Sequence, residues 1–375
     1  MLRRACAIFL IGIGLFVLPG CWDYQDLDEL SLPIVGIYDL AKPSEKNEEK
    51  VKVAGIFPVL YPKTEGRYTI VYENGQTVGQ TREKRNYYSP ETLNVGMLQV
   101  GIYGEKLARK GLHGASDILY RAPKVKNTIY MAVLEGGTEA LSKLKLKDYP
   151  NPGVYLFGLL KTAQKKSFLP TTTLHLYGVQ EVTAGKNPVI PLLKMKSNSR
   201  IEISGTGIFK KDKLIAKIDL KDTRSLVMLR GLEGEGSIPF IVEKNGEKID
   251  EGSVLVKRSR KVRVTRKGDD FTFFITVKLQ GDVIEHSSQK FFIDTKNTMP
   301  LEEIQTVIKR EIERDCRKFT QRMQEEFKVD CIDVTKYALA KWRKELKDKV
   351  EEGFIENVKI VVDVEVKIKG VGVLT

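Results

Sequence analysis

The sequence has few of the residues from which disulfide scaffolds and metal sites are built. Its 375 residues include only 4 cysteines and 3 histidines. Four cysteines are too few to stabilise a chain of this length by disulfides alone. His113, His175 and His286 are isolated from one another in the sequence, so a metal centre built from histidines is not expected. The apolar fraction of 42% excludes a mostly disordered chain. The length predicts two or three domains with sizeable cores.

The motifs of common enzyme classes are also missing. The sequence contains no P-loop, no HExxH, no GxSxG and no CxxC. The glycine-rich run at 231–236 follows an expected helix rather than a strand, so it does not match a dinucleotide-binding turn. Asp269-Asp270 lies between two expected strands and is interpreted as a turn. We therefore expect no enzymatic activity, no cofactor and no metal. A hydrolase with an unrecognised carboxylate pair is the remote alternative.

The sequence has only one long hydrophobic run, and it lies at the start. Ala5–Leu18 follows Arg3 and Arg4 and spans 14 residues, which is short for a helix that must cross about 30 Å of hydrocarbon. A basic start followed by an apolar stretch of about 7–15 residues is typical of a secretory signal. Residues 1–20 are therefore predicted to be a signal peptide.

The residues at the end of this run predict a lipid anchor. Leu18-Pro19-Gly20-Cys21 resembles a bacterial lipobox, in which a diacylglyceryl group is attached to the cysteine and the chain is cut before it. Cleavage is expected between Gly20 and Cys21, with lipid carried on Cys21. Two acyl chains anchor a protein stably where one does not. An ordinary signal peptide with an incidental cysteine is the alternative.

Removal of the signal would also discard Cys6 and leave two cysteines in the folded part. Cys316 lies on the apolar stripe of an expected helix, which favours a buried free thiol. Cys331 lies near the start of the next expected helix. A disulfide between them across the helix junction is the alternative, if their Cα atoms approach within about 7 Å.

Hydrophobic periodicity predicts an α+β protein. Apolar residues recur every three or four positions over 301–327, which predicts a long amphipathic helix, and a second helix is expected over 333–349. Strict alternation over 358–368 predicts a strand with one buried face. Strands are also expected over 93–103, 170–176 and 254–279, the last interrupted by a turn. We expect several domains, with mainly antiparallel sheets each flanked by helices. The proposed division is 21–196 and 197–375, and a split of 21–196 into two subdomains is the alternative.

The net charge of +13 has one local concentration. Residues 257–267 hold seven basic residues among eleven and no acidic one, and the pattern favours a strand with a basic face. Contact with anionic lipid headgroups, contact with an acidic partner and a solvated edge strand are the three interpretations. Nucleic acid is not expected as a partner of an exported lipoprotein. The basic residues are Lys257, Arg258, Arg260, Lys261, Arg263, Arg266 and Lys267.

The order of short motifs resembles a known family. Gly20-Cys21-Trp22-Asp23, followed by Asp28-Glu29-Leu30, is similar to the start of the Ger(x)C spore germination lipoproteins, the C subunits of nutrient germinant receptors. Weaker matches follow in the family's order at 187–194, 223–226 and 336–344. The resemblance implies α+β domains without enzymatic activity, attachment to the outer face of the inner spore membrane, and integral-membrane A and B subunits as partners. Cys21 is the only residue for which the resemblance implies a defined chemical role.

These observations support a lipid-anchored, non-enzymatic receptor subunit that is needed for germination triggered by nutrients. A substrate-binding lipoprotein of a transporter is the alternative, since a lipobox is equally compatible with it. Such proteins usually show repeated βα units in two lobes, and the sequence pattern does not indicate this arrangement. The sequence does not name the nutrient.

Overall fold

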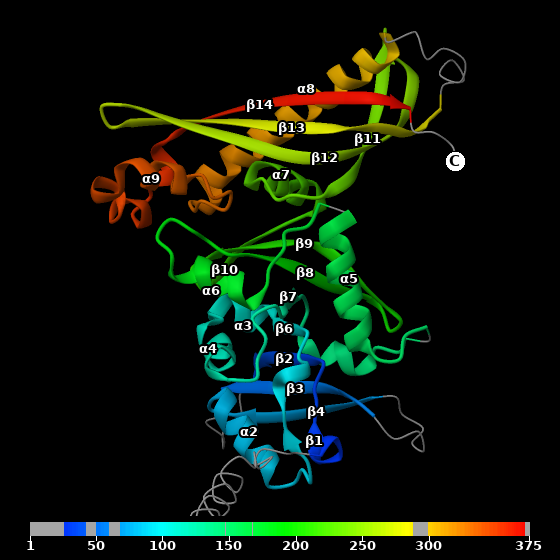
Figure 1. The fold of residues 1–375 in the computed structure, drawn as a ribbon, viewed down its shortest axis with the longest axis vertical. Coiled ribbons are helices and arrows are strands. Elements are labelled where there is room, and N and C mark those ends of the chain that lie inside the picture. The colour runs from blue at the N-terminus through cyan, green and yellow to red at the C-terminus, as the bar shows by residue number, and fades with distance from the viewer. Residues whose placement is uncertain are drawn as a thin grey trace, which may run out of the picture.

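The computed structural model describes residues 26–42, 50–59, 68–146, 148–166, 168–287 and 299–371. Figure 1 shows two sheets stacked along the longest axis of the molecule, each with helices packed on it. The α+β class expected from the sequence is confirmed. The predicted signal peptide and the predicted lipidation site, Gly20 and Cys21, lie outside the described residues.

The first sheet has eight strands in the order β10-β9-β8-β7-β6-β2-β3-β4. Its four central strands, β8, β7, β6 and β2, are parallel, and antiparallel strands extend both sides. A two-stranded pair of β1 (Leu30–Ser31) and β5 (Thr92–Leu93) lies apart from it. The strands of the large sheet are β2 Val35–Leu40, β3 Val51–Pro58, β4 Tyr68–Gly75, β6 Val100–Gly104, β7 Tyr130–Leu134, β8 Val189–Ser197, β9 Arg200–Lys210 and β10 Lys213–Ile218.

Helices cover both faces of this sheet. Buried residues of α2, α3, α4 and α6 pack on one face around Tyr38, Tyr103 and Phe209. Buried residues of α5 pack on the other face around Ile37 and Ile102. The helices are α2 Val78–Asn86, α3 Glu105–Lys110, α4 His113–Arg121, α5 Pro152–Lys166 and α6 Leu174–Val182, with shorter turns η1 Leu27–Glu29, η2 Val95–Met97 and η3 Thr138–Lys143.

A Gly-Ile-aromatic triplet recurs in this sheet. It occurs in β2 (36–38), β3 (55–57), β6 (101–103) and β9 (207–209). The register places Gly36 directly opposite both Gly55 and Gly101. The aromatic ring two residues on folds back over its glycine: a Cβ added to Gly55 would lie 2.4 Å from the Phe57 ring. Because side chains alternate between faces, the row contributes no side chain of its own to the face that α2 covers, and the aromatic rings lie over it.

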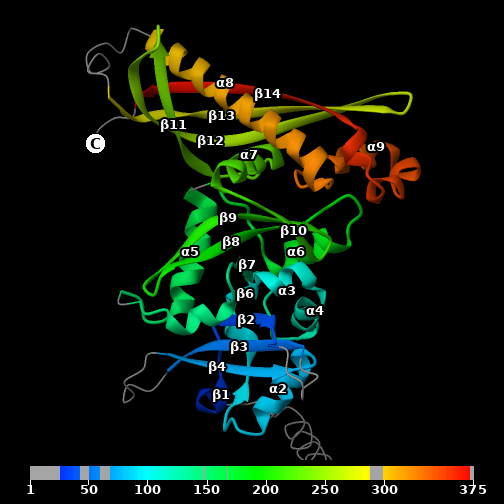
Figure 2. The same cartoon turned by 180° about the vertical axis from the view of Figure 1, so that it is seen from behind.

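The second sheet has four strands in the order β11-β12-β13-β14. The first three are antiparallel and β14 is parallel to β13. Figure 2 shows the long helix α8 and the shorter α7 and α9 beside this sheet. The elements are β11 Glu235–Lys244, β12 Glu247–Lys267, β13 Asp270–His286, β14 Lys359–Val371, α7 Leu220–Arg230, α8 Met299–Arg322, the π-helical turn η5 Met323–Phe327, α9 Thr335–Leu346, η6 Lys349–Glu351 and η7 Phe354–Asn357.

The apolar patterns of the C-terminal part are confirmed. The α8 stripe of Ile304, Ile308, Ile312, Cys316 and Phe319 is buried against the sheet. The alternating residues of β14 also enter this core, at Val362, Val364 and Ile368. Cys316 and Cys331 are both buried and both free thiols. The disulfide considered as an alternative is therefore wrong.

Two strand predictions are wrong. Residues 170–176 were expected to form a strand, but α6 begins at Leu174, and the Thr173 side chain accepts a hydrogen bond from Leu176 N at 3.3 Å. His175 is exposed on that helix. The single strand expected over 93–103 divides into β5, η2 and β6 because the Asn94 side chain caps the η2 turn, accepting from Gly96 N at 3.0 Å.

The proposed division near residue 196 does not coincide with the edge of a sheet. β8 ends at Ser197, and β9 and β10 continue the same eight-stranded sheet to Ile218. Ile208 and Ile218 also enter the core of the C-terminal part. The chain therefore passes between the two sheets after β10, where α7 begins.

Candidate functional site

The basic run predicted from the sequence lies on β12, and strand alternation divides it into two sets. Arg258 is buried, and Arg260 and Arg266 are partly buried on the face that packs against the helices. The side chains of Lys257, Lys261, Arg263 and Lys267 are exposed on the opposite face. The seven residues therefore do not form one surface.

Arg258 binds backbone carbonyls at the end of α7. Its Nε donates to Leu232 O at 2.9 Å and its Nη2 donates to Glu233 O at 3.3 Å. The guanidinium lies 4.8 Å from the centre of the Phe168 ring. Burial lowers the Arg258 pKa to about 10. These contacts hold the α7–β11 connection against β12.

Arg260 and Arg230 bind the loop that connects η5 to α9. Arg260 donates to Ile332 O at 2.7 Å and to Asp333 O at 3.3 Å. Arg230 is 5% exposed, and its Nη2 lies 3.3 Å from the Asp333 carboxylate. Burial lowers the Arg260 pKa, against the nearby Tyr337, Asp330 and Asp333, which raise it.

The same loop also contacts the segment that precedes β8. Asn187 donates through Nδ2 to Asp330 O at 3.3 Å, and Arg230 donates to Asn187 O. Asp330 is 3% exposed and accepts from Ile332 N and Thr335 N. Burial raises the Asp330 pKa. Buried arginines therefore join the two sheets through the loop at 330–333.

The exposed basic residues form a stripe on the uncovered face of the four-stranded sheet. Register places Lys261 opposite Thr276 and Arg263 opposite Phe274, whose ring centre lies 4.4 Å from the Arg263 guanidinium. Figure 1 places this sheet at one end of the longest axis, and β1 and β4, beside the first described residues, at the other. We call Lys257, Lys261, Arg263 and Lys267 the basic stripe.

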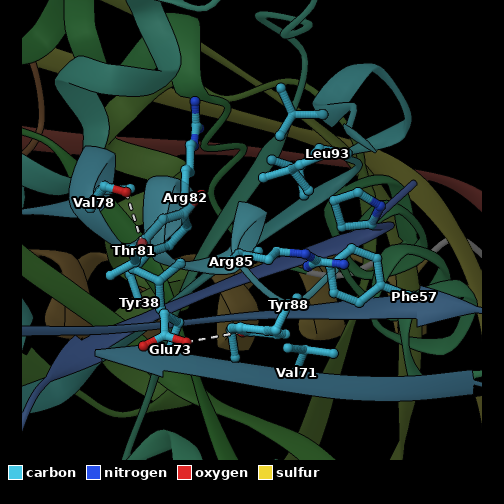
Figure 3. A pocket seen from close by; sticks show the side chains of 17 residues that line it. Tyr38, Phe57, Val71, Glu73, Val78, Thr81, Arg82, Arg85, Tyr88 and Leu93 are labelled. Carbon is cyan, nitrogen blue, oxygen red and sulfur yellow. Dashed lines mark hydrogen bonds between the residues drawn. The ribbon is translucent and has the colours of Figure 1, made fainter. Parts of the chain in front are cut away.

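A pocket opens at that other end of the molecule (Figure 3). Its floor is formed by β2, β3 and β4, with the Tyr38 and Phe57 side chains lying over Gly36 and Gly55, and α2 and the segment at 88–98 cover it. Most of the wall is apolar, with Pro33, Val71 and Leu93 among the lining residues. A second hollow shares Phe57, Val71, Arg85 and Tyr88 with it and extends to Leu27 and Leu30.

Two polar groups stand at the junction of these hollows. The Tyr88 hydroxyl donates to the Glu73 carboxylate at 3.0 Å, and burial and this bond raise the Tyr88 pKa. Arg85 donates from Nη2 to Ser31 Oγ at 2.6 Å, and its guanidinium lies 4.1 Å from the Phe57 ring centre. Figure 3 shows Arg85 extending from α2 toward Phe57.

A third, open cleft lies at the carboxyl ends of the parallel strands β2 and β6. Its charged groups pair with one another: Lys52 with Glu139 at 3.0 Å, and Arg109 with Glu105 at 2.8 Å. Asp39 accepts from Thr138 N at 3.0 Å. In the described part of the chain, no cluster of three or more potential ligand residues is arranged to hold a metal ion.

The pocket was not among the sites predicted from the sequence. The repeated Gly-Ile-aromatic triplets were the available signal, but their alignment depends on cross-strand register. Arg85 lies in a polar stretch of the sequence. The pattern of that stretch predicts a helix, but it does not indicate which side chains face inward. Among the described helices, none is long and apolar enough to span a bilayer.

Comparisons with known proteins match almost the whole chain. The family model "Spore germination protein N-terminal domain" matches residues 23–195, and "Spore germination B3/ GerAC like, C-terminal" matches residues 204–372. The chain is 25% identical to the spore germination protein GerQC of Bacillus cereus, over 82% of this chain and 86% of that protein. It is 24% identical to the putative spore germination protein YfkR of Bacillus subtilis, covering 82% and 81%. The crystal structure of the GerBC protein has the same fold, with a TM-score of 0.58 at 16% identity, over 87% of this chain and 96% of that one.

Proposed function

Because this chain belongs to the GerAC-like family of spore germination proteins, we propose that it is a lipid-anchored, non-enzymatic subunit of a nutrient germinant receptor. Integral-membrane A and B subunits would be its partners, on the outer face of the inner spore membrane. The observation that carries this proposal is the pair of family matches, which together cover residues 23–195 and 204–372. The Gly20-Cys21-Trp22-Asp23 motif at a lipobox supports the anchor.

The anchor would hold a defined end of the molecule at the bilayer. Five residue steps separate Cys21 from Asp26, and a fully extended chain of that length spans at most about 18 Å. Asp26 and η1 directly precede β1 in the chain, and Figure 1 places β1 at the end that carries the pocket. A diacylglyceryl group on Cys21 would therefore keep the pocket end close to the headgroups.

The basic stripe is better suited to an acidic partner protein than to the lipid of that bilayer. The eight strands of the first sheet are stacked along the longest axis. Seven inter-strand steps of about 4.8 Å give about 34 Å between β4 and β10. Attraction between exposed charges is screened over about 8 Å at physiological salt. With the longest axis of the molecule pointing away from the membrane, the basic stripe lies farther from the lipid headgroups than this screening distance.

The role in germination is tested by deleting the gene and measuring the loss of optical density of spores after nutrient addition. The expected result is a germination defect with at least one nutrient, restored by a wild-type copy. Spores of the deletion strain that germinate normally with every nutrient would refute the assignment.

The anchor is tested separately by fractionation. Wild-type chain is expected in the membrane fraction, and a Cys21→Ala chain in the soluble fraction or retained with an uncut signal. A matched Cys331→Ala chain, altered at a buried thiol, should fractionate as wild type. Equal lipid labelling of the wild-type and Cys21→Ala chains would refute attachment at Cys21.

The proposed partner contact is tested by charge reversal on the basic stripe. Lys261→Glu with Arg263→Glu should reduce co-purification of the A and B subunits, while reversal of the exposed Lys106 should not. Unchanged co-purification, or binding of the purified chain to anionic vesicles through these two residues, would refute the partner proposal.

A further inference from the structure

Arg85 forms no ion pair within 4 Å in the described part of the chain, and the charge of Glu91 acts on it from a greater distance. Its Nη2 is bound to the neutral hydroxyl of Ser31, and its guanidinium lies against the Phe57 ring. Its Nε is buried without a hydrogen-bond partner. The Glu73 carboxylate accepts from Tyr88 and does not pair with Arg85. Burial nevertheless lowers the Arg85 pKa against the Glu91 charge, so an anion bound within hydrogen-bond distance of the guanidinium would offset the cost of its desolvation.

The space beside Arg85 is shaped for a small apolar group. The Tyr38 and Phe57 side chains lie over the glycine row and form the floor with it: a Cβ on Gly36 would lie 2.8 Å from the Tyr38 hydroxyl oxygen, and one on Gly55 would lie 2.4 Å from the Phe57 ring. The cavity volume, measured to the centres of water-sized spheres, is about 60 Å³. One water needs about 10–15 Å³ of occupied volume, so the pocket has room for a compact apolar group.

We propose that this pocket binds a small carboxylate with a compact apolar body. The carboxylate accepts from Arg85 at the junction of the two hollows, and the apolar body lies under α2 against the Tyr38 and Phe57 side chains that cover the glycine row. A carboxylate is the anion whose two oxygens match a guanidinium edge, and a mostly apolar pocket with a few fixed polar groups is typical of small-ligand sites. This inference is independent of the receptor assignment, and normal germination of deletion spores would not affect it.

The first experiment compares three probes of similar shape on the full-length chain purified in detergent. Isovalerate carries the carboxylate, isovaleramide replaces it by a neutral amide, and isobutylamine replaces it by a cation. Ligand-detected saturation-transfer NMR with titration gives each dissociation constant. We expect saturable isovalerate binding, at least tenfold weaker binding of the amide, and no binding of the amine. Equal affinity for acid and amide, or no binding of isovalerate, would overturn the proposal.

The second experiment assigns the binding to the pocket. Arg85→Gln should weaken isovalerate binding at least tenfold. Arg121→Gln is the matched control, because Arg121 is also in the last turn of a nine-residue helix but is exposed and paired with Asp117; its affinity should stay within twofold of wild type. Leu93→Trp, which fills the pocket wall without changing a charge, should also abolish binding. Wild-type affinity in Arg85→Gln, or in a folded Leu93→Trp chain, would overturn the assignment.

Discussion

The arginines that pack beside the two sheets differ in the hydrogen-bond acceptors that surround them. In the C-terminal part, Arg258 and Arg260 donate to backbone carbonyls, and Arg230 adds the carboxylate of Asp333. At the far end of the N-terminal sheet, Arg85 meets one hydroxyl and an aromatic ring, and its Nε has no partner. Burial of a guanidinium is therefore not by itself a functional signal. The set of acceptors around it separates a structural arginine from one that can bind a ligand.

The difference follows from where each arginine lies. Helix ends leave unpaired carbonyls, and α7 ends at Arg230 beside the two β12 arginines, with Gly231 in the left-handed conformation at φ 71°. The loop at 330–333 adds further carbonyls from the other side. Arg85 instead extends from the last turn of α2 over a glycine row, where the hydroxyl of Ser31 in β1 is its hydrogen-bond acceptor. The arginines near the end of α7 therefore connect the two sheets, whereas the space beside Arg85 remains a cavity.

The largest effect is expected for Arg230→Met. Loss of this arginine leaves Asp333 without its ion-pair partner and removes the donor to Cys331 O and Asn187 O. Breaking a buried pair typically costs about 3–5 kcal/mol, so the free energy of unfolding by urea should fall by that amount. Arg109→Met, which breaks an exposed pair on α3, should cost less than about 1 kcal/mol. Similar losses in both variants would contradict a structural role for Arg230.

A smaller loss is expected for Arg258→Met. The variant keeps the apolar stem beside Phe168 but leaves Leu232 O and Glu233 O without this donor. Unsatisfied buried acceptors cost about 1–3 kcal/mol. Urea unfolding should show this decrease, and isovalerate binding should be unchanged. A stability equal to wild type would show that these carbonyls do not need Arg258.

Little change in stability is expected for Lys261→Glu on the basic stripe. Its side chain is exposed and faces solvent from the uncovered side of the sheet. Surface substitutions away from packed features usually change stability by less than about 0.5 kcal/mol. A thermal unfolding midpoint well below wild type would mean that the basic stripe belongs to the fold rather than to a contact surface.

The smallest effect is expected from the exposed pair of His113 and Glu181. His113 Nδ1 lies 2.8 Å from Glu181 Oε1, and this hydrogen bond and the Glu181 charge raise the His113 pKa. Because the His113 pKa is higher in the folded chain than in the unfolded chain, the pair stabilises the folded state fully at pH values below the unfolded pKa of about 6.5. This contribution is lost as the pH rises through the folded pKa. NMR titration should give a His113 pKa above 6.5 that falls in Glu181→Gln. An unchanged pKa in that variant would refute the pairing.

Residue patterns were sufficient to predict the elements with strong periodicity. The α8 stripe and the alternation of β14 depend on local spacing alone, and both are buried as expected. The prediction at 170–176 is wrong because the alternation of Leu174, His175 and Leu176 resembles that of a strand, whereas Thr173 caps a helix that begins at Leu174.

The sites could be predicted only in part. The basic run is a strand, as expected, but which arginines are satisfied depends on carbonyls from α7 and the loop at 330–333, far away in the sequence. The pocket depends on the register that aligns Gly36 with Gly55 and Gly101. Neither relation can be deduced from the spacing of residues along one strand.

The most direct test of a membrane-tethered germination subunit is complementation of the deletion strain. Spores receive either the wild-type chain or the Cys21→Ala chain, at equal abundance verified by immunoblotting, and the rate of optical-density loss after nutrient addition is measured. The expected result is that the wild-type chain restores the rate and the Cys21→Ala chain does not. Full restoration by the Cys21→Ala chain, or a deletion strain with no defect to restore, would contradict this function.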